Sequence, residues 1–169
     1  NKSWNASLQI IAISMSTSTK LHISDSASFH DPTLYRQIVG ALQYLTLKRP
    51  DLSFSVNRVC QYMHNPTINQ WAAVKRILRY LQHSKHMHLL IPKSTSFSLQ
   101  TFTDSDWADY LDDKKSTGGF AIFLGSSLVS WSSKKQRTVA RSSIESEYKA
   151  LAGGATELTW IPFCYLNLV

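Results

Sequence analysis

Residues 119–132 read GFAIFLGSSLVSWS, and this stretch decides the fold. It holds two short runs rich in apolar, β-branched and aromatic side chains, 119–124 and 127–132, separated only by Gly125 and Ser126. Such runs are typical of half-buried strands. A two-residue loop that begins with Gly favours a tight hairpin. The sequence therefore predicts an antiparallel pair of strands at this position.

The segments around the hairpin extend this pattern. Three further runs of similar composition are predicted as short strands, and they are 88–91, 97–104 and 137–140. A long helix is expected to begin near Ser142, because Ser142 and Glu145 have the spacing of a capping box. Pro162 should end or kink that helix. The second half of the chain is therefore predicted to be a sheet with a covering helix.

The chain before residue 88 has the periodicity of helices. Asp31 followed by Pro32 should open the first helix, Pro50 the second, and Thr67 should cap the third. The apolar side chains that recur at helical spacing are Leu34, Ile38, Ala41, Leu42 and Leu45, then Phe54, Val56, Val59, Cys60 and Met63, then Trp71, Val74, Ile77, Leu78 and Leu81. Residues 14–31 are rich in Ser and Thr and aperiodic, as in a linker or a surface segment.

These elements predict an α+β chain, in which three basic helices precede a sheet and a covering helix. We divide it into a linker or extended segment (1–31), a helical region (32–87) and a sheet region (88–169). The chain has 169 residues, 43% of them hydrophobic and 17% charged, a composition that excludes disorder. No run of about 18 apolar residues is present, which excludes a membrane span. Two cysteines cannot build a disulfide framework, so a reducing compartment is expected.

The positive charge is concentrated in the middle third. Residues 35–90 carry eight basic side chains against Asp51 alone, which accounts for the whole net charge of +7. Localised positive charge is the footprint of a phosphate-binding surface. Lys75, Arg76 and Arg79 share the side of the third helix away from its apolar stripe. That side either lies on nucleic acid or faces water, and the sequence leaves both open.

Two carboxylates are candidates for chemistry. Asp104 ends a predicted strand, and Glu147 lies in the first turns of the long helix. Glu145, roughly 160° away around that helix, already has a capping role. The apolar residues that share the direction of Glu147 are Ala150, Leu151, Gly154, Leu158 and Ile161. Glu147 is therefore predicted to lie on the buried stripe, where a carboxylate is costly unless it is paired or binds a metal.

Asp104 and Glu147 are expected to converge on Mg²⁺, which prefers hard oxygen ligands. Two such ions about 3.5–4 Å apart activate water and stabilise the leaving oxygen in phosphodiester hydrolysis. The structural alternative is that Asp104 caps a turn and Glu147 pairs with a neighbouring base. The residue pattern alone leaves this alternative open.

Several segments are similar to one known family. They are 35–50 (YRQIVGALQYLTLKRP), 71–81 (WAAVKRILRYL), 102–108 (FTDSDWA), 130–136 (SWSSKKQ) and 141–151 (RSSIESEYKAL). In this order they resemble the pol polyprotein of copia-type LTR retrotransposons, from the end of the reverse transcriptase through the connection into the ribonuclease H domain. The resemblance extends from about residue 20 to about residue 160, and its motifs are specific because several occur at fitting spacing.

The resemblance implies a ribonuclease H-like fold with a mixed sheet and a helix on its face. It implies Mg²⁺-dependent cleavage of the RNA strand of RNA–DNA hybrids, with Asp104 and Glu147 as catalytic metal ligands. The helical region would be the thumb and connection, which hold the hybrid by shape and phosphates. The expected nucleic-acid contacts are Lys75, Arg76, Arg79, Lys134, Lys135 and Arg141. The other expected partner is the remainder of the polyprotein, in a cytoplasmic particle or the nucleus.

The sequence departs from the family pattern at several points. The family has a third metal ligand, an Asp beyond the covering helix, and a fourth carboxylate downstream. No Asp follows Asp113 here. Asp109 stands where the family usually has Gly, and Pro162 interrupts a helix that the family continues. We therefore expect a truncated domain that is inactive or nearly so by itself. The alternative is a catalytically silent basic nucleic-acid-binding module or a decayed coding remnant.

Overall fold

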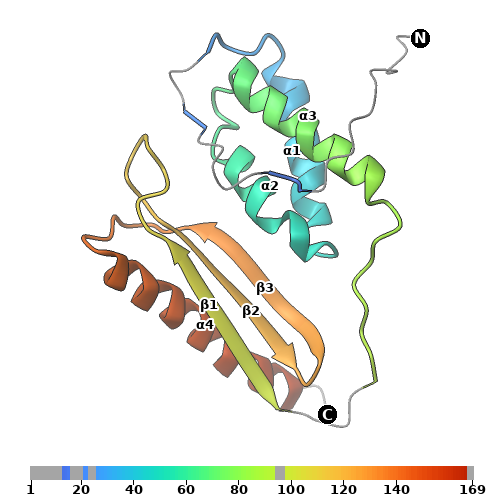
Figure 1. The fold of residues 1–169 in the computed structure, drawn as a ribbon, viewed down its shortest axis with the longest axis vertical. Coiled ribbons are helices and arrows are strands. Elements are labelled where there is room, and N and C mark those ends of the chain that lie inside the picture. Colours follow the sequence, from blue (N-terminus) through green and yellow to red (C-terminus); the bar gives the residue numbers. More distant parts are fainter. Residues whose placement is uncertain (1–12, 16–20, 23–25, 94–97, 167–169) are drawn as a thin grey trace. The chain divides into compact units, whose positions relative to one another are not determined.

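The computed structural model describes residues 13–15, 21–22, 26–93 and 98–166, with only the backbone of 164–166. The chain forms two compact units, a first unit of residues 1–88 and a second unit of residues 89–169 (Figure 1). In the described residues the first unit is helical, and the second combines a three-stranded sheet with one helix. The predicted α+β class is confirmed. None of the described helices has the length and apolar character needed to cross a membrane.

The first unit begins its helices where the sequence predicts. Its elements are α1 (Pro32–Leu45), the 3₁₀ helix η1 (Pro50–Leu52), α2 (Ser53–Cys60) and α3 (Ile68–His83). The Oδ1 atom of Asp31 accepts a hydrogen bond of 2.9 Å from the Leu34 amide, which satisfies a donor of the first turn. The Thr67 amide donates to Oε1 of Gln70 over 2.7 Å, one half of a capping box.

The buried face of α1 is offset from the predicted one. Leu34 and Ala41 were expected in the core but are exposed, whereas Tyr35, Val39 and Leu42 are buried. Tyr35 is fully buried, and its hydroxyl donates to the carbonyl oxygen of Val59 over 2.8 Å. Because this bond satisfies the one polar atom of the side chain, it offsets the cost of removing the hydroxyl from water.

The described parts of segment 1–31 pack against the helices. Met15, Leu21 and Phe29 are all buried in the core of the first unit. The Phe29 ring stacks on Trp71 of α3, with 4.6 Å between the ring centroids. This contribution of the N-terminal segment to the core was missed because its apolar residues have no regular spacing.

A buried arginine fork joins the end of α1 to the end of α3. Arg49 donates from Nε and Nη2 to the two carboxylate oxygens of Asp51, over 2.9 and 2.8 Å. It also donates to the carbonyl and hydroxyl oxygens of Ser84, while the Tyr80 hydroxyl donates to Asp51. Burial acts to raise the pKa of Asp51, but the hydrogen bonds from Arg49 and Tyr80 outweigh it and lower that pKa.

We expect Asp51→Asn to lower the free energy of unfolding of the first unit by about 1–3 kcal/mol, because it leaves the Arg49 guanidinium without its counter-charge. Since the pKa of Asp51 is lowered by folding, its contribution is present at neutral pH. It is lost as the pH falls below the ordinary carboxyl range of about 4 and through the lowered pKa. Urea unfolding at pH 7 and pH 3 measures this, with the exposed Lys85→Gln as control. Equal midpoints for Asp51→Asn and wild type at pH 7 would contradict it.

The second unit is a hairpin-built sheet covered by a helix. Its elements are β1 (Leu99–Asp106), β2 (Thr117–Leu124), β3 (Ser127–Lys135) and α4 (Ser143–Leu166). The strand order is β1-β2-β3, with both pairs antiparallel. Leu124 pairs with Ser127 across the predicted two-residue loop, and Gly125 has φ of 58°, a left-handed conformation that favours glycine. The predicted hairpin is confirmed.

Two predicted strands are not formed. Residues 88–91 and 137–140 have no strand pairing. In the latter segment, the carbonyl oxygens of Val139 and Ala140 accept hydrogen bonds from the side chains of Lys149 and Trp107. The described strands are antiparallel throughout, so the mixed sheet implied by the resemblance is not seen in this part of the chain. Each connection here is short, whereas parallel neighbours need a long crossover.

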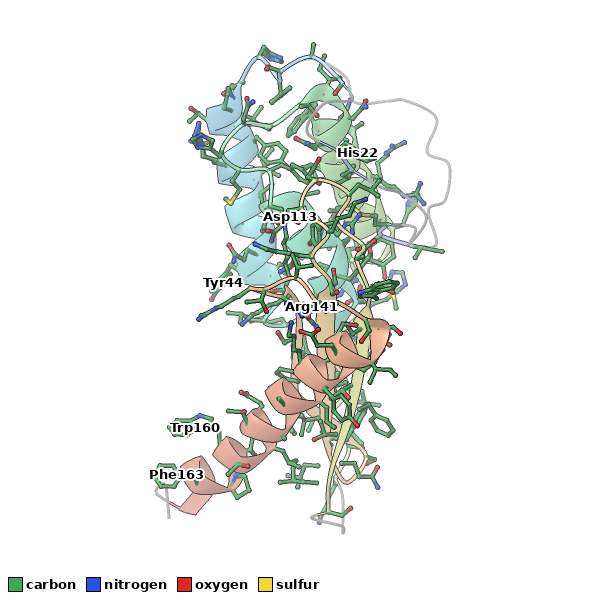
Figure 2. All side chains as sticks on the ribbon, turned by 90° about the vertical axis from the view of Figure 1, so that its left-hand side faces the viewer. His22, Tyr44, Asp113, Arg141, Trp160 and Phe163 are labelled. Atoms are coloured by element: carbon green, nitrogen blue, oxygen red, sulfur yellow. The ribbon has the colours of Figure 1, made fainter. Side chains whose placement is uncertain are left out.

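Helix α4 covers one face of the sheet, over β1 and β2 (Figure 1). Its predicted start is confirmed, because the Ser142 hydroxyl accepts a hydrogen bond of 3.1 Å from the Glu145 amide. Pro162 was expected to end or kink this helix, and it does not end it, since α4 continues to Leu166. Beside this proline, the exposed rings of Trp160 and Phe163 stack on each other (Figure 2).

Two adjacent glycines of α4 have different environments. A Cβ atom on Gly154 would lie 2.7 Å from Cγ2 of Thr103 and 3.0 Å from Cγ2 of Thr101. Glycine is therefore required there for the helix to approach β1. A Cβ atom on Gly153 would meet no atom within 4 Å.

We expect Gly154→Ala to lower the free energy of unfolding by about 1–3 kcal/mol, because the methyl group overpacks the interface between helix and sheet. Gly153→Ala should instead raise it by about 0.5–1 kcal/mol, since alanine has the higher helix propensity and nothing obstructs it. Thermal unfolding followed by circular dichroism compares the two variants. An unchanged melting temperature for Gly154→Ala would show that α4 does not approach the sheet this closely.

Candidate functional site

Asp104 lies near the C-terminal end of β1 on the face that α4 does not cover. Thr101 and Thr103 contact α4 at Gly154. Because side chains alternate along a strand, Asp104 points to the opposite face. Its carboxylate is exposed, and its Oδ1 atom accepts a hydrogen bond of 2.9 Å from the Ser105 amide. The carboxylate is therefore accessible at the end of the strand.

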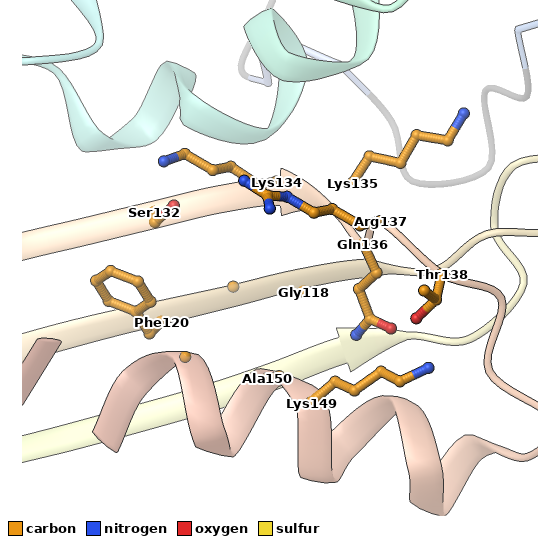
Figure 3. A pocket seen from close by; sticks show the side chains of 12 residues that line it. Gly118, Phe120, Ser132, Lys134, Lys135, Gln136, Arg137, Thr138, Lys149 and Ala150 are labelled. Atoms are coloured by element: carbon orange, nitrogen blue, oxygen red, sulfur yellow. The ribbon is translucent and has the colours of Figure 1, made fainter. Parts of the chain in front are cut away.

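Glu147 is exposed, so the prediction that it lies on the buried stripe is wrong. The residues that α4 buries against the sheet are Ser146, Ala150 and Gly154, spaced four apart, and Glu147 lies beside this row. Lys149 borders a groove on the β3 side of the helix (Figure 3). Two residues of helix correspond to roughly 160° around the axis. Glu147 therefore faces the other flank, toward β1, one of the two edge strands of the described sheet.

One glutamine joins the two segments that carry these carboxylates. Nε2 of Gln136 donates to Oγ of Ser105 over 3.3 Å and to the carbonyl oxygen of Ser146 over 2.9 Å. We call this arrangement the Gln136 clasp. Asp104 directly precedes Ser105, and Glu147 directly follows Ser146. The clasp thus holds the end of β1 against the first turns of α4, with one predicted ligand beside each of its two contacts.

A second tie lies next to the clasp. Nε1 of Trp107 donates to the carbonyl oxygen of Ala140 over 3.0 Å, which joins the loop after β1 to the segment before α4. The backbone amide of Gln136 also donates to the carbonyl oxygen of Ser116 over 2.9 Å. Sequence analysis assigned no role to Gln136. The only signal at Gln136 was its place at the end of the SWSSKKQ motif.

Two acids of the loop after β1, Asp109 and Asp113, contact side chains of β2 and β3. Asp113 forms an ion pair with Lys135, with 2.8 Å between Oδ2 and Nζ. The same ammonium lies 4.2 Å from the centre of the Tyr110 ring. Burial acts to raise the pKa of Asp113, but the hydrogen bond and charge of Lys135 outweigh it and lower that pKa. Oδ2 of Asp109 accepts a hydrogen bond from Thr117. Across the described ranges, no three His, Cys, Asp or Glu side chains form a group that could hold a metal.

The six predicted nucleic-acid contacts fall into two sets. Lys75 and Arg76 are half-buried and Arg79 is exposed, all on α3 of the first unit. In the second unit Lys134 and Arg141 are exposed. Lys135 is half-buried and already neutralises Asp113, which leaves its ammonium less available for a phosphate.

The chain is similar to retrovirus-related Pol polyproteins of Arabidopsis thaliana. It is 48% identical to the one from transposon RE2 over 151 residues and 46% identical to the one from transposon RE1 over 147 residues. These matches cover 89% and 87% of this chain but 10% of each relative. An uncharacterized mitochondrial protein of the same plant is 50% identical over 149 residues, which cover 86% of this chain and 62% of that protein.

The chain is therefore homologous to a segment of retrovirus-related Pol polyproteins, and the resemblance predicted from its motifs is confirmed. It spans about a tenth of the length of those Pol relatives. No protein-family model matches the chain, and no solved structure matches it significantly.

We expect Gln136→Leu to loosen the contact between β1 and α4, because it leaves the Ser146 carbonyl and the Ser105 hydroxyl without their donor. The loss of a buried hydrogen-bond partner costs about 1–3 kcal/mol. Amide hydrogen exchange in the first turns of α4 should therefore accelerate about tenfold or more. The exposed Gln100→Leu on β1 is the matched control. Unchanged exchange in Gln136→Leu would show that the clasp does not hold the two segments together.

Proposed function

We propose that this chain is the part of a Pol polyprotein that contributes to Mg²⁺-dependent cleavage of the RNA strand of RNA–DNA hybrids during reverse transcription. The second unit would be the N-terminal part of a ribonuclease H-like domain. The observation that carries this proposal is the Gln136 clasp, which holds the residues next to Asp104 and Glu147 in one place. The similarity to Pol polyproteins supports it, since two of them contain a segment 46–48% identical to this chain.

The proposed metal ligands are the carboxylates of Asp104 and Glu147. Their chemistry fits Mg²⁺, which is usually bound by one or two carboxylates together with waters and substrate phosphates. When bound, the ions activate water and stabilise the leaving oxygen. The Ser105 amide orients the Asp104 carboxylate by donating to Oδ1. Glu147 lies on the flank of α4 nearest to β1, the strand that carries Asp104.

We assign the remaining ligands of the site to other parts of the Pol polyprotein, because the Pol relatives are about ten times longer than this chain. The hybrid would be held by its phosphates, through Lys75, Arg76 and Arg79 in the first unit and through Lys134 and Arg141 in the second. Contacts of this kind read backbone shape and charge, so they tolerate any base sequence.

The test is cleavage of a labelled RNA–DNA hybrid by a Pol polyprotein that carries this segment. Loss of an outer-shell partner of a metal already costs about 10–100-fold, so we expect Asp104→Asn and Glu147→Gln to slow cleavage by at least about a hundredfold. Binding of the hybrid without Mg²⁺ should be unchanged. Asp112→Asn, which alters an exposed carboxylate of the neighbouring loop, is the control.

Undiminished cleavage by Asp104→Asn would overturn the proposed role of this carboxylate. The 169-residue chain alone should bind the hybrid without turnover, because two carboxylates do not complete a two-metal site. Turnover by this chain that disappears in Asp104→Asn would instead show that its own residues suffice.

A further inference from the structure

A groove of about 510 Å³ lies in the second unit between α4 and the β2–β3 side of the sheet (Figure 3). The residues that line it include no carboxylate, whereas four cations border it: Lys134, Lys135, Arg137 and Lys149. It lies on the flank of α4 away from Glu147, so it is separate from the proposed metal ligands. Sequence analysis assigned no role to Arg137 or Lys149.

Two of the four cations have uncompensated charge. Nζ of Lys135 already forms an ion pair of 2.8 Å with Asp113. Nζ of Lys149 forms an ion pair of 2.7 Å with Glu145 and donates to the Val139 carbonyl, so its charge is partly neutralised. Lys134 and Arg137 are exposed and form no ion pair with any acid of the described chain. The positive potential of the groove therefore comes mainly from Lys134 and Arg137. Such a potential suits an anionic ligand.

The floor of the groove is made of backbone and very small side chains. Gly118, Gly119, Ala150 and Gly153 all line it. Gly153 is the informative member, because a glycine inside a helix is less favourable than alanine and no neighbouring atom requires it here. Its neighbour Gly154, in contrast, is required by contact with β1. A glycine without a packing role on the wall of a basic groove leaves room for a ligand to approach the helix closely.

One wall of the groove is aromatic. Phe120 of β2 is half-buried, and its side chain lines the groove (Figure 3). An aromatic ring beside cations is the combination by which proteins bind nucleic-acid strands, since bases stack on the ring while phosphates contact the cations. An acidic peptide would use the cations but would gain nothing specific from this ring.

We infer that this groove binds the phosphates of one nucleic-acid strand, with Lys134 and Arg137 as the phosphate contacts and Gly153 at the point of closest approach. The inference rests on the proposed function for the nature of the partner, and it adds a binding site on the flank of α4 away from the carboxylates. A strand in this groove would be held by charge and shape, independently of its base sequence.

The test is binding of the complete 169-residue chain to a fluorescein-labelled RNA–DNA hybrid, measured by anisotropy over a range of salt concentrations without Mg²⁺. Each phosphate contact contributes about 0.7–0.9 to the slope of log K against log salt. The double variant Lys134→Gln/Arg137→Gln should therefore reduce this slope by about 1.4–1.8. Lys93→Gln/Lys114→Gln removes the same charge from exposed sites outside the groove and should change the slope by less than half as much.

Gly153→Leu fills the groove without removing charge. It should weaken binding about tenfold or more, the scale of losing one or more phosphate contacts, without lowering the melting temperature. Gly40→Leu is its matched control, because Gly40 is also a helical glycine with no atom within 4 Å of a Cβ position. It should leave binding unchanged. The melting curves of the two variants distinguish a loss of binding caused by unfolding from one caused by filling the groove.

The possible outcomes separate this inference from the proposed function. Unchanged affinity and slope in both groove variants, while Asp104→Asn abolishes cleavage by the polyprotein, would overturn the groove alone. Weakened binding in the groove variants, with cleavage retained in Asp104→Asn, would support the groove and overturn the proposed chemistry. If the groove variants weaken binding of a labelled poly-glutamate peptide but not of the hybrid, the occupant is an acidic peptide and the inference is wrong.

Discussion

In the second unit, the connection between the end of β1 and the first turns of α4 depends on the carboxamide of Gln136. This one group donates to the Ser105 hydroxyl at the end of β1 and to the Ser146 carbonyl in the first turns of α4. Both hydrogen bonds lie at the end of the sheet, where β1 ends and α4 begins. Hydrogen bonds therefore join helix and sheet beside the candidate site, while further along α4 the two are joined by close packing at Ala150 and Gly154.

Local signals in the sequence were sufficient to predict where most elements begin. Asp31 with Pro32, Thr67 with Gln70, Ser142 with Glu145 and the Gly125 turn each act through neighbours within four residues, so their chemistry can be read from the chain alone. Segments 88–91 and 137–140 have the composition of strands but pair with no other strand. Whether a strand forms depends on a partner distant in sequence, which composition does not reveal.

In the candidate site, too, local features could be predicted from the sequence, whereas contacts between distant segments could not. Asp104 and Glu147 were selected from residue type and spacing, but the exposure of Glu147 follows from where the sheet contacts α4, which helical periodicity cannot specify. Gly153 and Gly154 make this limit clear. They are identical and adjacent in sequence. Gly154 is required because Thr101 and Thr103 lie against it, whereas Gly153 has open space beside it. Only the three-dimensional arrangement distinguishes a glycine needed for packing from one that leaves a groove accessible.

The position of β1 at one edge of the described sheet has a consequence for behaviour in solution. Along its outer side, the amide and carbonyl groups of this strand form no ladder with another described strand. Uncommitted backbone groups of this kind can recruit a strand from another molecule. Self-association of the isolated polypeptide would then rise with concentration, and a neighbouring strand from a longer polyprotein would suppress it by occupying the same hydrogen-bonding groups.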